Sequence, residues 1–149
     1  RADLQKAPVR LLLFGLITSL ETAMLHSIRS LYPHGQWTDS LSAARVAAAK
    51  ALLELRKTRN EAIDLADCLQ LCDKREILLK NPQALDAFGF KSRRKGTEVM
   101  KRIESLRDKL AHSQDIIAGT TWEDVIELAD EMDDLLLRTR DFANGTSSY

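Results

Sequence analysis

The feature that most constrains this chain is the three- and four-residue spacing of its apolar positions. In the segment 8–31, leucine, isoleucine and methionine recur at positions 12, 13, 16, 17, 20, 24, 25 and 28, as on one face of an α-helix. The same spacing returns at positions 99, 103, 106 and 110. Only 6 of the 149 residues are glycine and 3 are proline, so few positions interrupt helices. Since no strand-like alternation of any length accompanies this pattern, we predict an all-α fold.

Local signals predict where the helices begin and end. Pro8 suits a first helical turn, and "YPHGQW" breaks the helix that follows it. Asp39 or Ser40 can cap a second helix, and "KTRNE" marks either a bend or a point through which that helix continues. Asn81 with the following proline opens a short helix, and Thr120 with Glu123 forms a capping box. The predicted helices cover about 8–31, 41–55, 62–81, a short piece from 82 to near "FGF", 92–112 and 122–142.

These helices predict one domain. The length is enough to bury a core without a metal or a disulfide. We predict an antiparallel bundle of four to five long helices plus one or two short helices over residues 1–149. The tail 143–149, "ANGTSSY", is small and polar and is expected to fray. Because the first residue is arginine instead of methionine, we expect a fragment of a longer protein.

Composition favours a soluble protein, 44% hydrophobic and 30% charged. The most apolar run, "VRLLLFGLITSL", falls short of the roughly 18–20 residues that span a bilayer and lacks a small-residue cleavage site. We predict a buried core helix there, no membrane association and a cytoplasmic location. Cys68 and Cys72 have no nearby histidine or second cysteine pair, so we interpret them as small buried thiols. No metal and no cofactor is expected.

The charges are balanced in sum but not along the chain. The formal net charge is +0, which argues against strong nonspecific attraction to nucleic acid. The segment from Lys91 to Lys109 contains eight basic residues and three acidic ones. The segment 110–149 contains nine acidic residues and two basic ones. The basic region could attract an RNA backbone, or the two regions could be solvated faces of complementary helices. On the first interpretation the phosphate contacts would be Lys91, Arg93, Arg94, Lys95, Arg102 and Lys109.

Arg107 and His112 carry the chemistry that this region suggests. Histidine exchanges a proton near neutral pH, and arginine can form two hydrogen bonds to phosphate oxygens. The pair could therefore cleave RNA without a metal. On a straight helix, however, side chains five positions apart point about 140° away from each other. Either the helix loosens near His112, or a second chain completes the site at a twofold axis. The alternative is an ordinary histidine favoured at a helix end by the dipole. Glu21 and His26 could lie near this helix, or be a satisfied or exposed pair.

The segment 107–112, "RDKLAH", resembles the arginine–polar–x(3–5)–histidine signature of the HEPN (higher eukaryotes and prokaryotes nucleotide-binding) domain family. The segment "VMKRIESLRDKLAHSQD" lies late in a helical domain, just before the last long helix, as in that family. The upstream "LADCLQLCDKREILLKNPQAL" is similar to the family's middle helices, so the resemblance spans about 61–140.

The resemblance implies a four- to five-helix bundle, usually a homodimer and often a metal-independent endoribonuclease of toxin–antitoxin or defence systems. Arg107 and His112 would be the catalytic pair. Asp108 would occupy the polar position, often asparagine, that orients the histidine, although its charge lies near an anionic substrate. The Tyr found shortly after the histidine in some toxins is absent from "HSQDI".

Two function classes remain open. The leading hypothesis is a HEPN-type ribonuclease whose site is composite at a homodimer twofold. The rival is a non-catalytic HEPN module that binds RNA or a nucleotide, or a dimerising regulatory domain attached to a missing N-terminal domain. An antitoxin or an upstream domain would then be a partner. A third interpretation is an unrelated helical interaction domain in which the motif occurs by chance.

Overall fold

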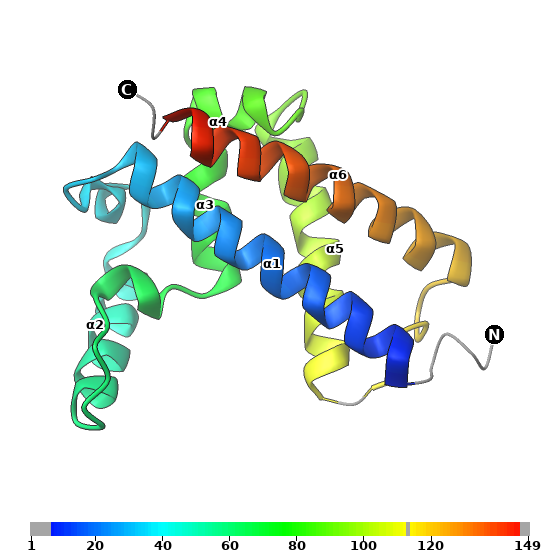
Figure 1. Ribbon diagram of the computed structural model, residues 1–149, viewed down its shortest axis with the longest axis horizontal. Helices are drawn as coiled ribbons and strands as arrows, with labels where there is room; N and C mark the ends of the chain where they lie inside the picture. Colours follow the sequence, from blue (N-terminus) through cyan, green and yellow to red (C-terminus); the bar gives the residue numbers. More distant parts are fainter. Residues whose placement is uncertain (1–6, 113, 147–149) are drawn as a thin grey trace.

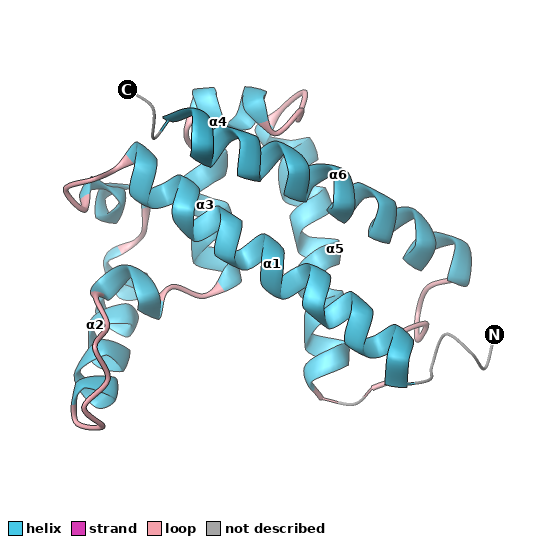
Figure 2. Ribbon diagram, viewed as in Figure 1, coloured by secondary structure: helices cyan, strands magenta, loops and turns pink. Residues whose placement is uncertain are grey.

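The computed structural model describes residues 7–112 and 114–146, and within these ranges every regular element is a helix (Figure 2). The prediction of an all-α fold is confirmed. The α-helices are α1 (Ala7–Leu31), α2 (Ala43–Lys57), α3 (Leu71–Leu79), α4 (Pro82–Ala87), α5 (Arg93–Ala111) and α6 (Trp122–Thr146). Two short 3-10 helices, η2 (Gln36–Ser40) and η3 (Leu65–Cys68), lie between α1, α2 and α3.

The capping signals place most boundaries, with corrections of a few residues. Asn81 caps α4, since its side chain accepts the N–H of Ala84, as predicted. The cap of α2 is Ser42, because 36–40 forms η2 instead of an open loop. The capping box of α6 lies one residue later than predicted. Thr121 Oγ1 accepts the N–H of Asp124, whose carboxylate accepts the N–H of Thr121.

Two predicted segments differ more from the structure. The segment 62–81 is divided into η3 and α3, because Asp67 Oδ2 accepts the N–H of Asp64, and Asp73 Oδ2 accepts that of Gln70. Each carboxylate satisfies a backbone N–H at the start of a new helix, so the chain restarts twice. At the other end, 143–146 belongs to α6 instead of a frayed tail. Ala143 is buried there, and residues 147–149 lie outside the described ranges.

The core is built around α1 and α6, which lie side by side and run in the same direction (Figure 1). Two hydrogen bonds show the parallel register: Ser27 Oγ donates to the carbonyl of Thr139, and Ser30 Oγ to that of Ala143. This pair departs from a simple up-and-down bundle. The intervening helices return the chain to the end where α1 began. Fully buried side chains at the centre of the fold include Ile17, Leu20, Ile28, Ile77, Leu78, Ile103 and Met132.

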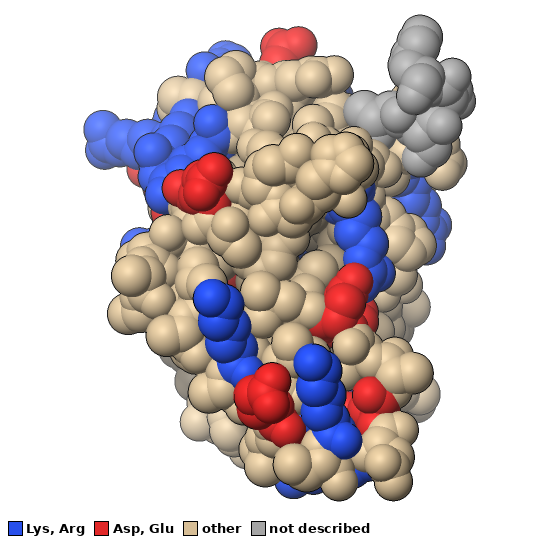
Figure 3. Space-filling view, turned by 90° about the vertical axis from the view of Figure 1, so that its left-hand side faces the viewer, with Lys and Arg blue, Asp and Glu red and all other residues tan. Residues whose placement is uncertain are grey.

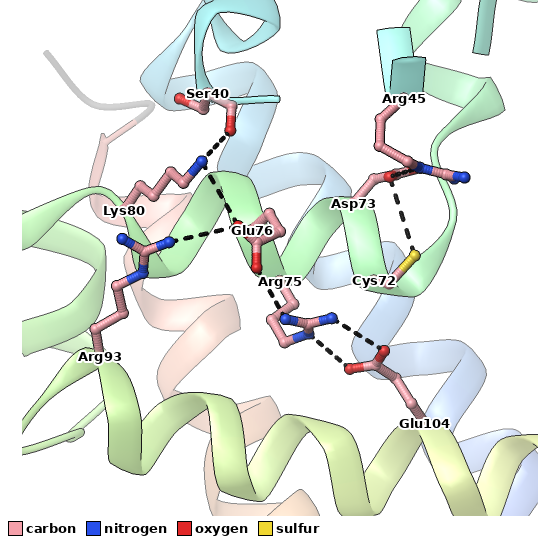
Figure 4. A network of polar contacts seen from close by, with 9 residues as sticks. All are labelled: Ser40, Arg45, Cys72, Asp73, Arg75, Glu76, Lys80, Arg93 and Glu104. Carbon is pink, nitrogen blue, oxygen red and sulfur yellow. Dashed lines mark hydrogen bonds and ion pairs between the residues drawn. The ribbon is translucent and has the colours of Figure 1, made fainter. Parts of the chain in front are cut away.

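The short α3 and the long α5 pack behind this pair (Figure 1). Polar contacts surround α3, where Arg75 Nε donates to Glu104 of α5 at 2.8 Å and Glu76 accepts a hydrogen bond from Arg93 (Figure 4). At the end of α4, the ring of Phe88 meets that of Phe142 edge to face, with centroids 5.5 Å apart. The two ion pairs hold α5 against α3, and the ring contact holds the end of α4 against α6.

Helix α2 stands to one side of the core (Figure 1). Of its side chains only that of Ala49 is buried. Arg45 ties α2 to α3 through a two-point contact with the buried Asp73, at 2.8 and 3.0 Å (Figure 4). The position of α2 therefore depends on polar contacts more than that of any core helix does.

The length and hydropathy of α1 are relevant to the prediction that the chain does not associate with a membrane. By length and composition α1 could cross a membrane, since its 18-residue window has a mean hydropathy of 1.6 and 39% of that window is buried. The sequence prediction considered a shorter apolar run. The core helix of a soluble protein and an N-terminal signal sequence meet the same criteria, so the finding is weak evidence for either location.

Candidate functional site

The candidate site is built on α5, whose sequence determines both of its ends. Ser92 caps the helix by accepting the N–H of Lys95 at 3.1 Å. Met100, Ile103 and Leu106 form the buried stripe that attaches α5 to the core. The helix stops at His112, whose backbone N–H donates to the carbonyls of the last turn. The helix bearing Arg107 is thus held in the core, whereas His112 lies at its end.

Arg107 is bound by a carboxylate from α1. Its Nε donates to Glu21 Oε1 at 2.7 Å, and its side chain keeps 42% of its surface exposed. The other oxygen of Glu21 lies 4.0 Å from the ammonium of Lys74. Of the alternatives for Glu21 and His26, Glu21 lies beside the motif helix and is satisfied there, whereas His26 is exposed. One carboxylate therefore serves two cations from two different helices.

Lys74 is a buried cation that the sequence analysis missed. Burial lowers the pKa of its ammonium, and Arg107 lowers it further, while the charge of Glu21 raises it. A signal was present in "LCDKREILL". Lys74 lies three residues after Leu71 and three before Ile77, so it occupies a core position of α3 by helical spacing. A lysine at such a position needs a carboxylate partner, and Glu21 supplies it.

A hollow of about 490 Å³ adjoins Arg107 between α5, η3, α3 and the inner side of α2. Its lining carries four carboxylates and two guanidinium groups, from Glu21, Asp67, Glu104, Asp108, Arg56 and Arg107. Most of these charges already have partners: Asp67 binds Arg29, Glu104 binds Arg75 and Arg56 binds Glu61. The formal balance of the lining is negative, which weakens its attraction for a free phosphate.

Hydrogen bonds fix the carboxylate of Asp67 in the wall of this hollow. Although burial raises the pKa of its carboxyl group, the backbone hydrogen bond from Asp64 and the hydrogen bond from Arg29 outweigh that effect and lower it. The carboxylate is thus held ionised as part of the fold. It supports the start of η3, beside the hollow.

His112 lies outside this hollow. Its side chain is exposed at the end of α5, whereas Arg107 and Asp108 line the hollow. Within 7–112 and 114–146, the hydrogen bond that joins Asp108 to His112 is between backbone groups, at 3.0 Å. The structure thus brings Arg107 and Asp108 together and leaves His112 apart, and α5 remains helical up to His112, without loosening earlier.

The predicted phosphate contacts divide into engaged and open side chains. Arg102 donates to Glu131 of α6 at 2.8 Å, and the ammonium of Lys109 donates to the carbonyl of Ala118 at 2.7 Å. Arg93 and Arg94 lie 3.4 Å from Glu76 and Glu98, respectively. Lys91 and Lys95 are exposed at the start of α5, along the rim of a shallow hollow beside Phe90.

The bond between Arg102 and Glu131 fits the interpretation that the basic region and the acidic last helix are complementary faces. On the face shown in Figure 3, basic and acidic side chains alternate over the lower part, whereas Lys and Arg side chains gather at the upper left. Electrostatic attraction of an RNA backbone would therefore rest on the start of α5, where Lys91 and Lys95 lie, more than on the whole basic segment.

Metal-ligand geometry is absent from the described ranges, where no group of three or more His, Cys, Asp and Glu side chains could hold an ion. Cys68 and Cys72 both line the hollow beside Arg107. Burial is the largest cause that raises the pKa of each thiol. Both are therefore poor nucleophiles at neutral pH, in keeping with small packing residues.

Comparison with known proteins returns no match to this chain among family models, curated proteins or solved structures. An arginine is held by Glu21 at a hollow, and an exposed histidine ends the same helix.

Proposed function

We propose that two copies of this chain form a HEPN-type, metal-independent endoribonuclease, with Arg107 and His112 as its catalytic residues. The observation that carries this proposal is the bond between Arg107 and Glu21. It holds Nε and leaves the two terminal nitrogens of a partly exposed guanidinium for a phosphate oxygen. An arginine fixed in this way can stabilise the charge that develops on phosphorus during strand cleavage.

His112 supplies the proton transfer in this proposal. Its imidazole is exposed and could take the proton of a ribose 2′-hydroxyl or give one to the leaving 5′-oxygen. In one copy Arg107 and His112 point to different sides of α5, so a single chain does not complete the reaction site. A twofold dimer would bring two of each residue together, one histidine acting as base and one as acid.

The exposed apolar face of α1 supports a homodimer. Leu11 and Leu12 are 72% and 71% exposed, and Phe14 is also exposed. An open groove of about 560 Å³ runs along this face and is closed on one side by Leu110, two residues before His112. Burial of such a face between two copies removes apolar surface from water next to the helix end that carries His112. A role in defence or in a toxin–antitoxin pair belongs to the same proposal.

The charge of the hollow favours a second candidate, a non-catalytic HEPN module. Four carboxylates line the hollow beside Arg107, and Glu21 already compensates the guanidinium. Such a site would bind RNA or a nucleotide weakly, or serve only as part of a dimerising regulatory domain. Cleavage activity separates the two candidates.

The test is cleavage of labelled structured and single-stranded RNAs in EDTA by wild type, Arg107→Ala and His112→Ala. Matched controls are Arg140→Ala, an exposed arginine of α6, and His26→Ala, an exposed histidine of α1. We expect a product ending in a cyclic phosphate, and a loss of roughly 100-fold or more in both site variants only. Circular dichroism and sedimentation confirm that all five proteins fold and associate alike.

Equal background in all five proteins would refute the ribonuclease. RNA binding that depends on Arg107 would then favour the module. A monomer without RNA binding would favour an unrelated helical domain in which the motif occurs by chance.

A further inference from the structure

The C-terminal end of α5 is held by a residue near the N-terminus of the chain. The guanidinium of Arg10, in the second turn of α1, donates through Nη1 to the carbonyl of Gln114 at 2.8 Å. Through Nη2 it donates to the carbonyls of Lys109 and Leu110, at 3.2 and 3.4 Å. These acceptors lie on both sides of His112, so one side chain spans the helix end that carries it.

This contact answers a general need of a helix end. The last carbonyls of a helix receive no N–H from a following helical turn, and they carry the negative end of the helix dipole. Here the carbonyl of Lys109 accepts the N–H of Gln114 and that of Leu110 accepts the N–H of His112, so Arg10 adds a further donor to each. A guanidinium offers five N–H donors and a permanent positive charge, so it satisfies several of these carbonyls at once. Because Arg10 reaches across about 100 residues of sequence, the contact exists only in the folded chain.

We propose that Arg10 is a positioning residue for His112, and that it sets the conformation of the helix end from which the imidazole projects. This inference rests on the proposed ribonuclease function. The imidazole itself is exposed, and no hydrogen bond or ion pair of its side chain is found among the described residues, so the backbone at His112 sets the direction from which it projects. That backbone is the segment that Arg10 holds.

The role is separable from general stability, because the core of α1 does not depend on Arg10. Leu13, Ile17 and Leu20 bury the inner face of the helix, whereas Arg10 lies near its exposed first turns. Loss of the guanidinium therefore removes hydrogen bonds at one helix end and leaves the hydrophobic contacts in place. Arg10 also lines the groove beside Leu110 that the proposed dimer would cover, so sedimentation must show that each variant associates as wild type does. With association unchanged, the effect should be local, at residues 109–118.

The experiment compares wild type with Arg10→Gln and Arg10→Lys. The matched control is Lys80→Gln, which also removes one cation and its hydrogen bond to a backbone carbonyl, that of Ser40 at 2.7 Å, away from His112. Two quantities are measured: kcat and KM of RNA cleavage, and the rate of amide hydrogen exchange in segment 109–118.

For Arg10→Gln we expect kcat to fall by roughly 10- to 100-fold with KM within about twofold, because the general acid or base is displaced while the substrate still binds. Exchange in 109–118 should be roughly tenfold faster, as lost hydrogen bonds let the segment open. Arg10→Lys, which can still donate to the carbonyls, should recover part of kcat, and Lys80→Gln should match wild type in both quantities.

Unchanged kcat in Arg10→Gln, with activity lost in Arg107→Ala and His112→Ala, would overturn the positioning role and leave the proposed function standing. If the wild type cleaves no RNA, the proposed function fails and the exchange rate decides whether Arg10 orders the helix end. Faster exchange only in Arg10→Gln would support that ordering, and equal exchange in all variants would overturn it.

Discussion

The sharing of Glu21 between Lys74 and Arg107 predicts a strong coupling that can be measured as stability. Glu21→Gln removes the carboxylate charge but keeps an amide oxygen that can accept from Arg107. Lys74 is then left as a buried cation without its compensating charge. Lys74→Met removes that cation and keeps the length and the apolar stem of the side chain.

The magnitudes follow from the two contacts. At 4.0 Å, an ion pair at an effective dielectric constant of about 20 is worth about 4 kcal/mol before desolvation is subtracted. Because burial of both charges opposes this gain, we expect about 1–2 kcal/mol of net coupling between Glu21 and Lys74. The bond to the partly exposed Arg107 adds about 0.5–1 kcal/mol. Glu21→Gln should therefore cost about 1.5–3 kcal/mol, and Lys74→Met should lie within about 1 kcal/mol of wild type.

The pH dependence has a definite sign. Because the pKa of Lys74 is lowered by folding, the unfolded chain binds its proton more tightly. Stability contributed by this group therefore rises with pH between its folded pKa and the ordinary value of 10.5. In Glu21→Gln the folded pKa falls further. The cost of that substitution should shrink as the pH rises from the folded pKa of Lys74 in the variant to its folded pKa in wild type, because only the variant loses the proton in that range. Lys74→Met should abolish this pH dependence.

The assay is urea unfolding at a fixed protein concentration, followed by the fluorescence of the buried Trp37 and Trp122. Wild type, Glu21→Gln, Lys74→Met and the double variant form a double-mutant cycle. The coupling predicts that Glu21→Gln costs only about 1 kcal/mol when Lys74 is already methionine. An equal cost in both backgrounds would refute the shared-carboxylate argument.

Three further predictions concern the core, the backbone and the thiols. Met132→Ala should cost about 2–5 kcal/mol in the same unfolding assay, because the side chain is fully buried in α6. Gly15→Ala should stabilise the protein by about 0.5–1 kcal/mol in thermal unfolding, since Gly15 lies in a helix and a Cβ there meets open space. Gly35→Ala should destabilise the protein by about 1 kcal/mol, because the backbone φ at Gly35 is +79°. At pH 7.5, iodoacetamide should alkylate both thiols more slowly than free cysteine, because burial raises their pKa values, and mass spectrometry should find Cys72 modified before the more buried Cys68.

Local chemistry was readable from the sequence where it acts over a few residues. The helix predicted over 92–112 has Ser92 as its N-cap and His112 as its C-cap. Helical spacing of apolar residues and a capping side chain both act within one or two turns, so they can be recognised without knowledge of the rest of the fold. The same reasoning failed between 62 and 81, because acidic side chains that could point to solvent instead cap η3 and α3.

The candidate site was predicted only in part, for a related reason. Arg107 and His112 could be recognised as chemically capable, and the sequence already showed that a straight helix separates them. The charges around Arg107 could not be placed, because Glu21 is 86 residues away and reaches it only when α1 crosses α5. An ion pair of this kind depends on helix direction and register, which apolar spacing does not specify.

The sequence by itself determined the helical class, most helix boundaries and the presence of an arginine and a histidine on one helix. Only the tertiary structure decided that α1 and α6 run in the same direction, that Glu21 joins Lys74 to Arg107, and that Arg10 holds the end of α5. The physical reason is the distance along the sequence over which each kind of interaction acts. Helix propensity and capping act between near neighbours along the chain. These contacts instead join groups about 50 to 110 residues apart, and they form only when the helices pack.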